Sequence, residues 1–197
     1  MPKKFTENRF LQAVTAWLLG VWAVTAIAPF NRFDWLLENM LVFIYGALLV
    51  FTYRRFRFSD LSYGLFAVFL SLHLVGAHYT YAETPFGFWL QDVLDLERNH
   101  YDRIVHFAFG LLLGYPFREF LIEVAGVRPA WSYLLAMTVV LGFSGFYEAL
   151  EGVVAVIVSP ELGAAYLGTQ GDEWDAQKDT ALAFAGSIVA MLFTWWW

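Results

Sequence analysis

Acidic and histidine residues are paired at helical spacing in the second half of the sequence. The pairs lie three or four residues apart: Asp102 and His106, Glu148 and Glu151, and Asp175 and Asp179. Residues at this spacing are neighbours on one face of a helix. Carboxylates and imidazoles bind divalent cations and transfer protons. The three pairs can form one site if the fold brings their helices together at one level.

The sequence around these pairs is strongly apolar. Of its 197 residues, 59% are hydrophobic and 15% are charged, whereas soluble domains carry about 25% charged residues. Each of six apolar segments is close to the ~20 residues that cross a bilayer: 10–28, 35–52, 61–79, 101–124, 131–158 and 176–197. We therefore predict an all-α fold, a polytopic membrane bundle of about six transmembrane helices, in one integral membrane domain covering 1–197. The first segment is expected to be a retained helix, because it is longer than the apolar part of a signal peptide.

Basic residues predict the orientation of the bundle. They gather in three regions: before the first segment (Lys3, Lys4, Arg9), after the second (Arg54, Arg55, Arg57) and around the turn after the fourth (Arg118, Arg128). Lysine and arginine favour cytoplasmic loops, so both termini are predicted to be cytoplasmic. All three acidic and histidine pairs then fall near the extracytoplasmic face. A GxxxG pattern at Gly110 and Gly114 permits a close helix contact there.

The paired residues predict a divalent metal site. Ionisable side chains inside a membrane are costly unless they are paired, hydrated or bound to metal. The predicted ligands are Asp102, His106, Glu148, Glu151, Asp175 and Asp179. Mixed histidine and carboxylate ligands suit Zn, Mn or Fe, and an oxygen-rich subset suits Mg. The sequence contains no cysteine, so thiolate ligands are excluded.

Further residues have predicted roles around this site. Glu151 or His100 is a candidate general base. Arg98 and Arg103 are candidates for binding an anionic lipid headgroup. His73, His78 and Asp172 are not assigned, because the histidines are five residues apart and an acid before a helix often caps it. Membrane lipids are the expected partners; the net charge of −6, with no basic patch, argues against nucleic acid.

Four stretches carry a likeness to a known family. They are HYTYA at 78–82, RNHYDRIVHF at 98–107, EALE at 148–151 and GTQGDEWDAQKD at 168–179. They resemble the YjdF-like bacterial inner-membrane proteins, a family of uncharacterised function. The resemblance covers most of the chain and implies a location in the bacterial inner membrane.

A more distant similarity is to the VanZ-like proteins. The matching positions are Asp102, His106, Phe107, Glu148, Glu151, Asp175 and Asp179. Glu151 stands where that group has glutamine, and Asp179 stands where it has asparagine.

Three functions are compatible with the sequence. The first is a metal-dependent membrane enzyme that performs hydrolysis or transfer on a lipid or lipid-linked substrate. The second is an ion- or proton-coupled transporter, because chains of membrane acids and histidines also conduct ions. The third is a non-catalytic scaffold whose polar cluster orients helices.

The orientation can be tested with a reporter tag inserted between residues 80 and 100. Since this segment is predicted to be extracytoplasmic, the tag should be accessible from outside in intact cells. A tag that reports the cytoplasm would overturn the orientation.

Overall fold

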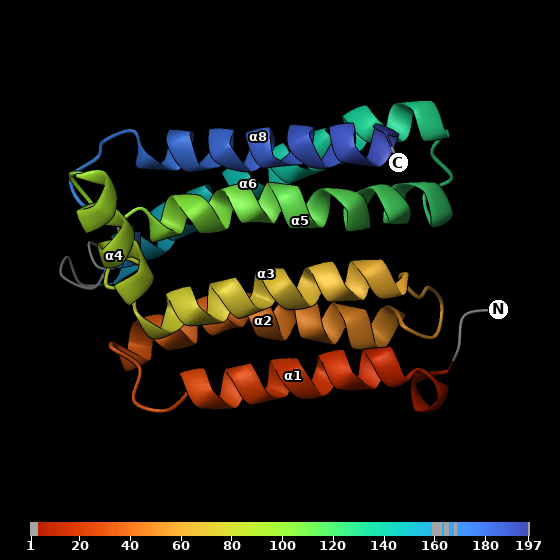
Figure 1. Ribbon diagram of the computed structural model, residues 1–197, viewed down its shortest axis with the longest axis horizontal. Helices are drawn as coiled ribbons and strands as arrows, with labels where there is room; N and C mark the ends of the chain where they lie inside the picture. Colours follow the sequence, from red (N-terminus) through yellow and green to blue (C-terminus); the bar gives the residue numbers. More distant parts are fainter. Residues whose placement is uncertain (1–3, 159–162, 164–165, 168, 197) are drawn as a thin grey trace.

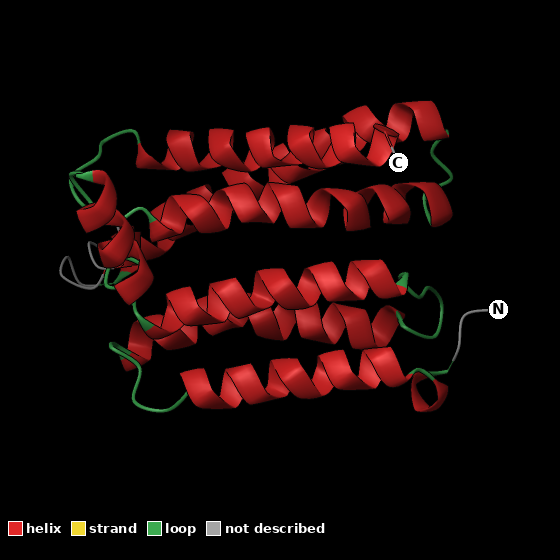
Figure 2. Cartoon of the chain, viewed as in Figure 1, coloured by secondary structure: helices red, strands yellow, loops and turns green. Residues whose placement is uncertain are grey.

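All regular secondary structure in the described part of the chain is helical. The computed structural model describes residues 4–158, 163, 166–167 and 169–196, and no strand occurs among them (Figure 2). The elements in chain order are a 3-10 helix at Phe5–Glu7, α1 at Arg9–Thr25, α2 at Arg32–Thr52, α3 at Asp60–His78, α4 at Pro85–Leu94, α5 at Tyr101–Glu123, α6 at Pro129–Ile157 and α8 at Asp175–Trp196. The all-α prediction is confirmed.

The long helices match the predicted membrane spans. Among the described residues, five helices are long and apolar enough to cross a bilayer, namely α2, α3, α5, α6 and α8. Helix α1 is apolar but has 17 residues. It ends three residues before the predicted limit, and Ala28 in the following turn has a positive φ of 46°. Large apolar side chains such as Phe51 and Val156 remain more than four-fifths exposed, as expected of surfaces that face lipid.

Helix α4 was not predicted. Its segment was treated as a loop between the third and fourth spans, but Pro85 occupies the first turn, where its missing N–H costs nothing. Asp95 ends the helix in the left-handed conformation. The ten-residue helix lies across one end of the bundle (Figure 1). It leaves Trp89 and Leu94 more than half exposed.

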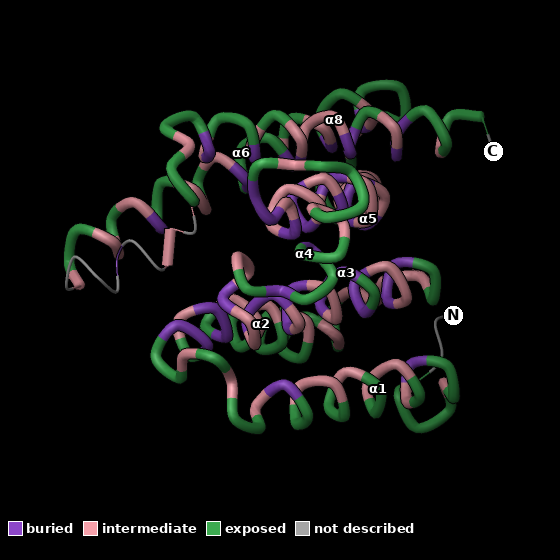
Figure 3. The backbone as a smooth tube through the Cα atoms, turned by 60° about the vertical axis from the view of Figure 1, so that its left-hand side comes forward, coloured by how far each residue is buried: buried purple, intermediate pink, exposed green. Residues whose placement is uncertain are grey.

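The long helices form two groups of three. Helices α1, α2 and α3 make one group, and α5, α6 and α8 make the other (Figure 1). Helices α3 and α5 join the groups. Buried positions lie along the inner faces of the helices, while much of the outer surface of α1, α6 and α8 is exposed (Figure 3).

Helices α5 and α8 approach until their backbones touch. A Cβ atom added to Gly110 would lie 1.7 Å from the carbonyl oxygen of Ala183. One added to Gly186 would lie 2.1 Å from that of Phe107. The predicted close contact at the GxxxG pattern is therefore present, with Gly186 as its reciprocal on α8. Both helices begin at the α4 end and run in the same direction (Figure 1).

Replacing these glycines should separate the two helices. We expect Gly110→Ala and Gly186→Ala each to lower the free energy of unfolding by about 1–3 kcal/mol or more, because the added methyl meets backbone atoms that cannot rotate away. Gly142→Ala in α6 is the control, since no atom lies within 4 Å of its added Cβ. Equilibrium unfolding in mixed micelles measures the difference. Equal effects at all three positions would contradict the contact.

Candidate functional site

Three of the predicted ligands meet at the α4 end of the α5–α8 contact. Asp102 and His106 from α5 and Asp179 from α8 each offer an atom, and these atoms lie within 4.8 Å of one another. Asp179 is 1% exposed. Its Oδ1 atom has no hydrogen-bond partner among the described residues. A buried carboxylate oxygen without a donor is costly, so this position favours a cation.

Glu148 of α6 joins this group through His106. Its Oε1 atom lies 3.1 Å from His106 Nε2, and Asp102 Oδ1 lies 3.5 Å from the same nitrogen. On the other side of the ring, Ser144 Oγ lies 3.5 Å from Nδ1. One imidazole nitrogen thus faces two carboxylates. A single N–H cannot donate well to both, whereas a cation between the three groups would be attracted to all of them.

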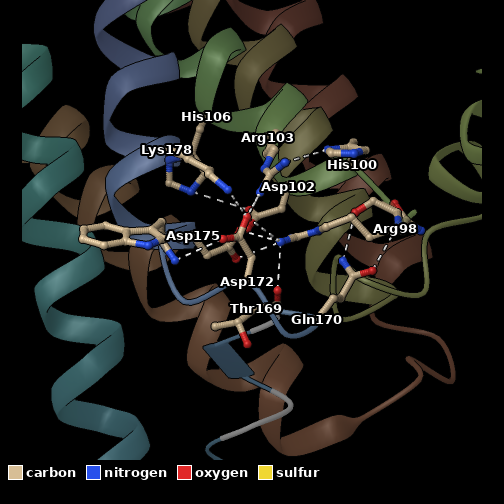
Figure 4. A network of polar contacts seen from close by, with 12 residues as sticks. Arg98, His100, Asp102, Arg103, His106, Thr169, Gln170, Asp172, Asp175 and Lys178 are labelled. Atoms are coloured by element: carbon tan, nitrogen blue, oxygen red, sulfur yellow. Dashed lines mark hydrogen bonds and ion pairs between the residues drawn. The ribbon is translucent and has the colours of Figure 1, made fainter. Parts of the chain in front are cut away.

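The predicted ligand Asp175 lies instead in a network of ion pairs (Figure 4). Its Oδ1 atom accepts hydrogen bonds from Arg98 at 2.5 Å and Arg103 at 3.2 Å. Asp172 accepts from Arg103 and, at 2.6 Å, from Lys178. The protein itself therefore supplies the positive charge for these two carboxylates, and the group of three possible ligands does not include them.

A reciprocal side-chain clamp holds this network in place. Gln170 accepts a hydrogen bond from the Asn99 backbone N–H at 3.0 Å and donates to its carbonyl at 2.9 Å. The Asn99 amide in turn donates to the carbonyl oxygens of Ala82 and Thr84. Three segments far apart in the sequence are joined in this way. The clamp gives Asn99 and Gln170 a structural role beside the network.

His100, a predicted general base, lies beside the arginines. Its Nδ1 atom is 3.2 Å from Arg103 Nη1. Burial, followed by the charges of Arg103 and Arg98, lowers the pKa of His100. The lowered pKa favours the neutral imidazole, which contacts Arg103 and is not one of the three possible ligands.

The two unassigned histidines have different surroundings. His73 is 2% exposed and is hydrogen-bonded to the Glu38 carbonyl at 3.1 Å and to the Tyr81 hydroxyl at 2.6 Å. It therefore borders the site. His78 contacts the Thr25 carbonyl at 2.9 Å and helps to hold the turn between α1 and α2. Its role there is structural.

Sequence reasoning missed two acids on α2. Asp34 and Glu38 are 4% and 3% exposed, and Tyr147 donates a hydrogen bond to Glu38 at 2.8 Å. Both line a cavity shared with Asp102 and Glu151. The signal that would have found them is their spacing of four residues at the start of an apolar segment. Asp34 was missed because it lies just before the predicted segment 35–52.

The ion pairs of Asp172 predict a pH-dependent stability. Hydrogen bonds from Lys178, the Trp174 backbone and Arg103 lower its pKa to about 2. A lowered pKa stabilises the fold at pH values above the unfolded value of 3.8, and this contribution is lost as pH falls towards 2. Asp172→Asn should therefore be less stable than wild type at pH 7, with a difference that shrinks between pH 5 and pH 2. Thermal unfolding across this range measures it; a constant difference would contradict the assignment.

Comparison with known proteins identifies the family. The family described as "Predicted membrane protein (DUF2238)" matches residues 10–197. Inner membrane protein YjdF of Escherichia coli (strain K12) is 37% identical over 171 residues, covering 86% of this chain and 81% of that protein. No solved structure gives a significant match. The comparisons do not show the similarity to VanZ-like proteins, which stays a prediction. The chain is an integral membrane protein that belongs to the DUF2238 family.

Proposed function

We propose that this protein is a metal-dependent membrane enzyme that hydrolyses or transfers a group on a lipid or lipid-linked substrate at the extracytoplasmic face of the inner membrane. One observation carries the proposal. Asp102, His106 and Asp179 converge within 4.8 Å, and the buried Asp179 Oδ1 has no hydrogen-bond donor in the described part of the chain. The orientation rests on the positive-inside pattern.

The ligand set suits a catalytic cation. Two carboxylates and one imidazole leave a coordination position for water or substrate, as in three-ligand catalytic zinc sites. Zn, Mn and Fe fit this mixed set, and Mg fits if water completes its shell. When bound, such a metal supplies an activated water or polarises an ester or phosphoryl oxygen.

The remaining side chains have roles of their own in this proposal. Glu148, beside His106, and Glu151, in the adjoining cavity, are placed to accept a proton. His100 is an alternative base on the rim. Arg98 and Arg103, which contact Asp175, would bind and orient an anionic headgroup.

The position of α4 supports a lipid substrate. This helix lies across the end of the bundle where the site is found (Figure 1). It exposes Phe86, Trp89 and Leu94 by 49%, 56% and 57%. Exposed aromatic and aliphatic side chains on a short helix at a bundle end are typical of the membrane interface. Lipid headgroups would therefore be present at the level of the carboxylates.

Metal binding tests the proposal directly. Purified protein should bind a divalent cation, and Asp179→Asn and His106→Ala should each weaken binding by at least about tenfold, because each removes one of three ligands. The measurement is isothermal titration with Zn²⁺ and Mn²⁺ on protein prepared without chelators, together with elemental analysis.

His78→Ala is the matched control. It removes a histidine that contacts the Thr25 carbonyl, so metal affinity should be unchanged. A wild-type protein that binds neither cation would overturn the proposed function, as would equal affinity in wild type and both site variants.

A further inference from the structure

A second group of carboxylates lies beside the first, in the cavity between the two groups of helices. Asp34 and Glu38 come from α2, Glu151 from α6 and Asp102 from α5. The cavity has room for about one water molecule or ion. Neither lysine nor arginine is among the described residues that line it. Four carboxyl groups around so small a space repel one another when they are ionised, and either protons or a cation between them relieves that repulsion.

Asp34 gives an independent reason to place a cation there. The residue is 4% exposed, and its Oδ1 atom has no hydrogen-bond partner among the residues that the structure describes. The hydroxyl groups of Thr80, Tyr81 and Tyr166 also line the cavity, but none of them is hydrogen-bonded to this oxygen. A buried carboxylate oxygen that borders a cavity and has no protein partner is free to bind a ligand in that cavity.

Nearby positive groups are already engaged. Arg98 and Arg103 contact Asp175, and Arg103 also contacts Asp172. His73 Nε2 lies 4.0 Å from Glu38 Oε2, but it is 3.1 Å from the Glu38 carbonyl, and Tyr81 occupies its other nitrogen. The imidazole is therefore a positioning group for Glu38. Its two ring nitrogens contact the Glu38 carbonyl and the Tyr81 hydroxyl, and neither contacts Asp34.

We propose that Asp34, Glu38 and Glu151 form a second cation subsite, with Asp102 as the carboxylate shared between the two cations. Unlike those of the first group, their ligand atoms do not all lie within 4.8 Å of one another, so a bound cation would draw them together. The proposal rests on the proposed function, because Asp102 also belongs to the first group. All donors in the second subsite are oxygen atoms, so it prefers a hard cation such as Mg²⁺, Mn²⁺ or Ca²⁺. The size of the cavity excludes an organic ammonium group. Shared-carboxylate centres of this kind place two cations about 3.5–4 Å apart.

The experiment is a Mn²⁺ titration followed by electron paramagnetic resonance. Wild-type protein should bind two Mn²⁺ per chain, and the second should broaden the signal of the first through spin coupling. Glu38→Gln and Asp34→Asn should each reduce the stoichiometry to one and restore the six-line signal of an isolated ion. Asp179→Asn should weaken the first ion, and Asp102→Asn should weaken both.

Glu123→Gln is the matched control, because Glu123 is an exposed acid at the opposite end of α5. It should retain two coupled ions. One Mn²⁺ in wild type, with Glu38→Gln and Asp34→Asn unchanged, would overturn the second subsite and leave the proposed function standing. No bound Mn²⁺ or Zn²⁺ at all would overturn both. The wild-type stoichiometry decides the matter even if a variant fails to fold.

Discussion

The backbone contact between α5 and α8 is the constraint on which the site depends. Gly110 and Gly186 lack the side chains that would hold the helices apart, so each approaches a carbonyl of the opposite helix. Such a contact fixes both the distance and the register of two helices, because any sliding would bring a larger residue into the gap. The register places His106 and Asp179 near the same level. A pair of helices with ordinary side-chain packing would stand several ångströms further apart.

The fold balances its buried charges in two different ways. Near the end of the bundle, Arg98, Arg103 and Lys178 neutralise Asp172 and Asp175. Among the residues that the structure describes, Asp179, Glu148 and Glu151 make no ion pair with lysine or arginine. Removing a charge from water costs several kcal/mol unless a partner or ligand compensates it. The outer network therefore has three cationic side chains for two carboxylates, which leaves it able to attract an anion, whereas the inner carboxylates would attract a cation.

Local sequence was sufficient for the helices and for part of the site. Apolar segments near 20 residues long predicted the spans, and spacing of three or four predicted the faces on which Asp102, His106 and Asp179 lie. The different surroundings of Asp175 and Asp179 were not predictable. Asp175 pairs with Arg98 and Arg103, which belong to a distant segment of the sequence, whereas Asp179 lies with the possible metal ligands. Asp34 and Glu38 were missed for a similar reason: their role depends on residues of other helices, namely Tyr147 of α6, which donates to Glu38, and the acids Asp102 and Glu151 that line the same cavity. Helix α4 was missed because ten residues are too few for periodicity to stand out.

The parallel course of α5 and α8 has an electrostatic consequence. Each helix carries a partial positive charge at its N-terminus, where the first backbone N–H groups lack acceptors. Because both helices begin at the α4 end, these two charges add where Asp102 and Asp175 occupy the first turns. An antiparallel pair would have cancelled them. The backbone thus contributes a fixed field that favours anionic groups at this end, whether they belong to the protein or to a substrate.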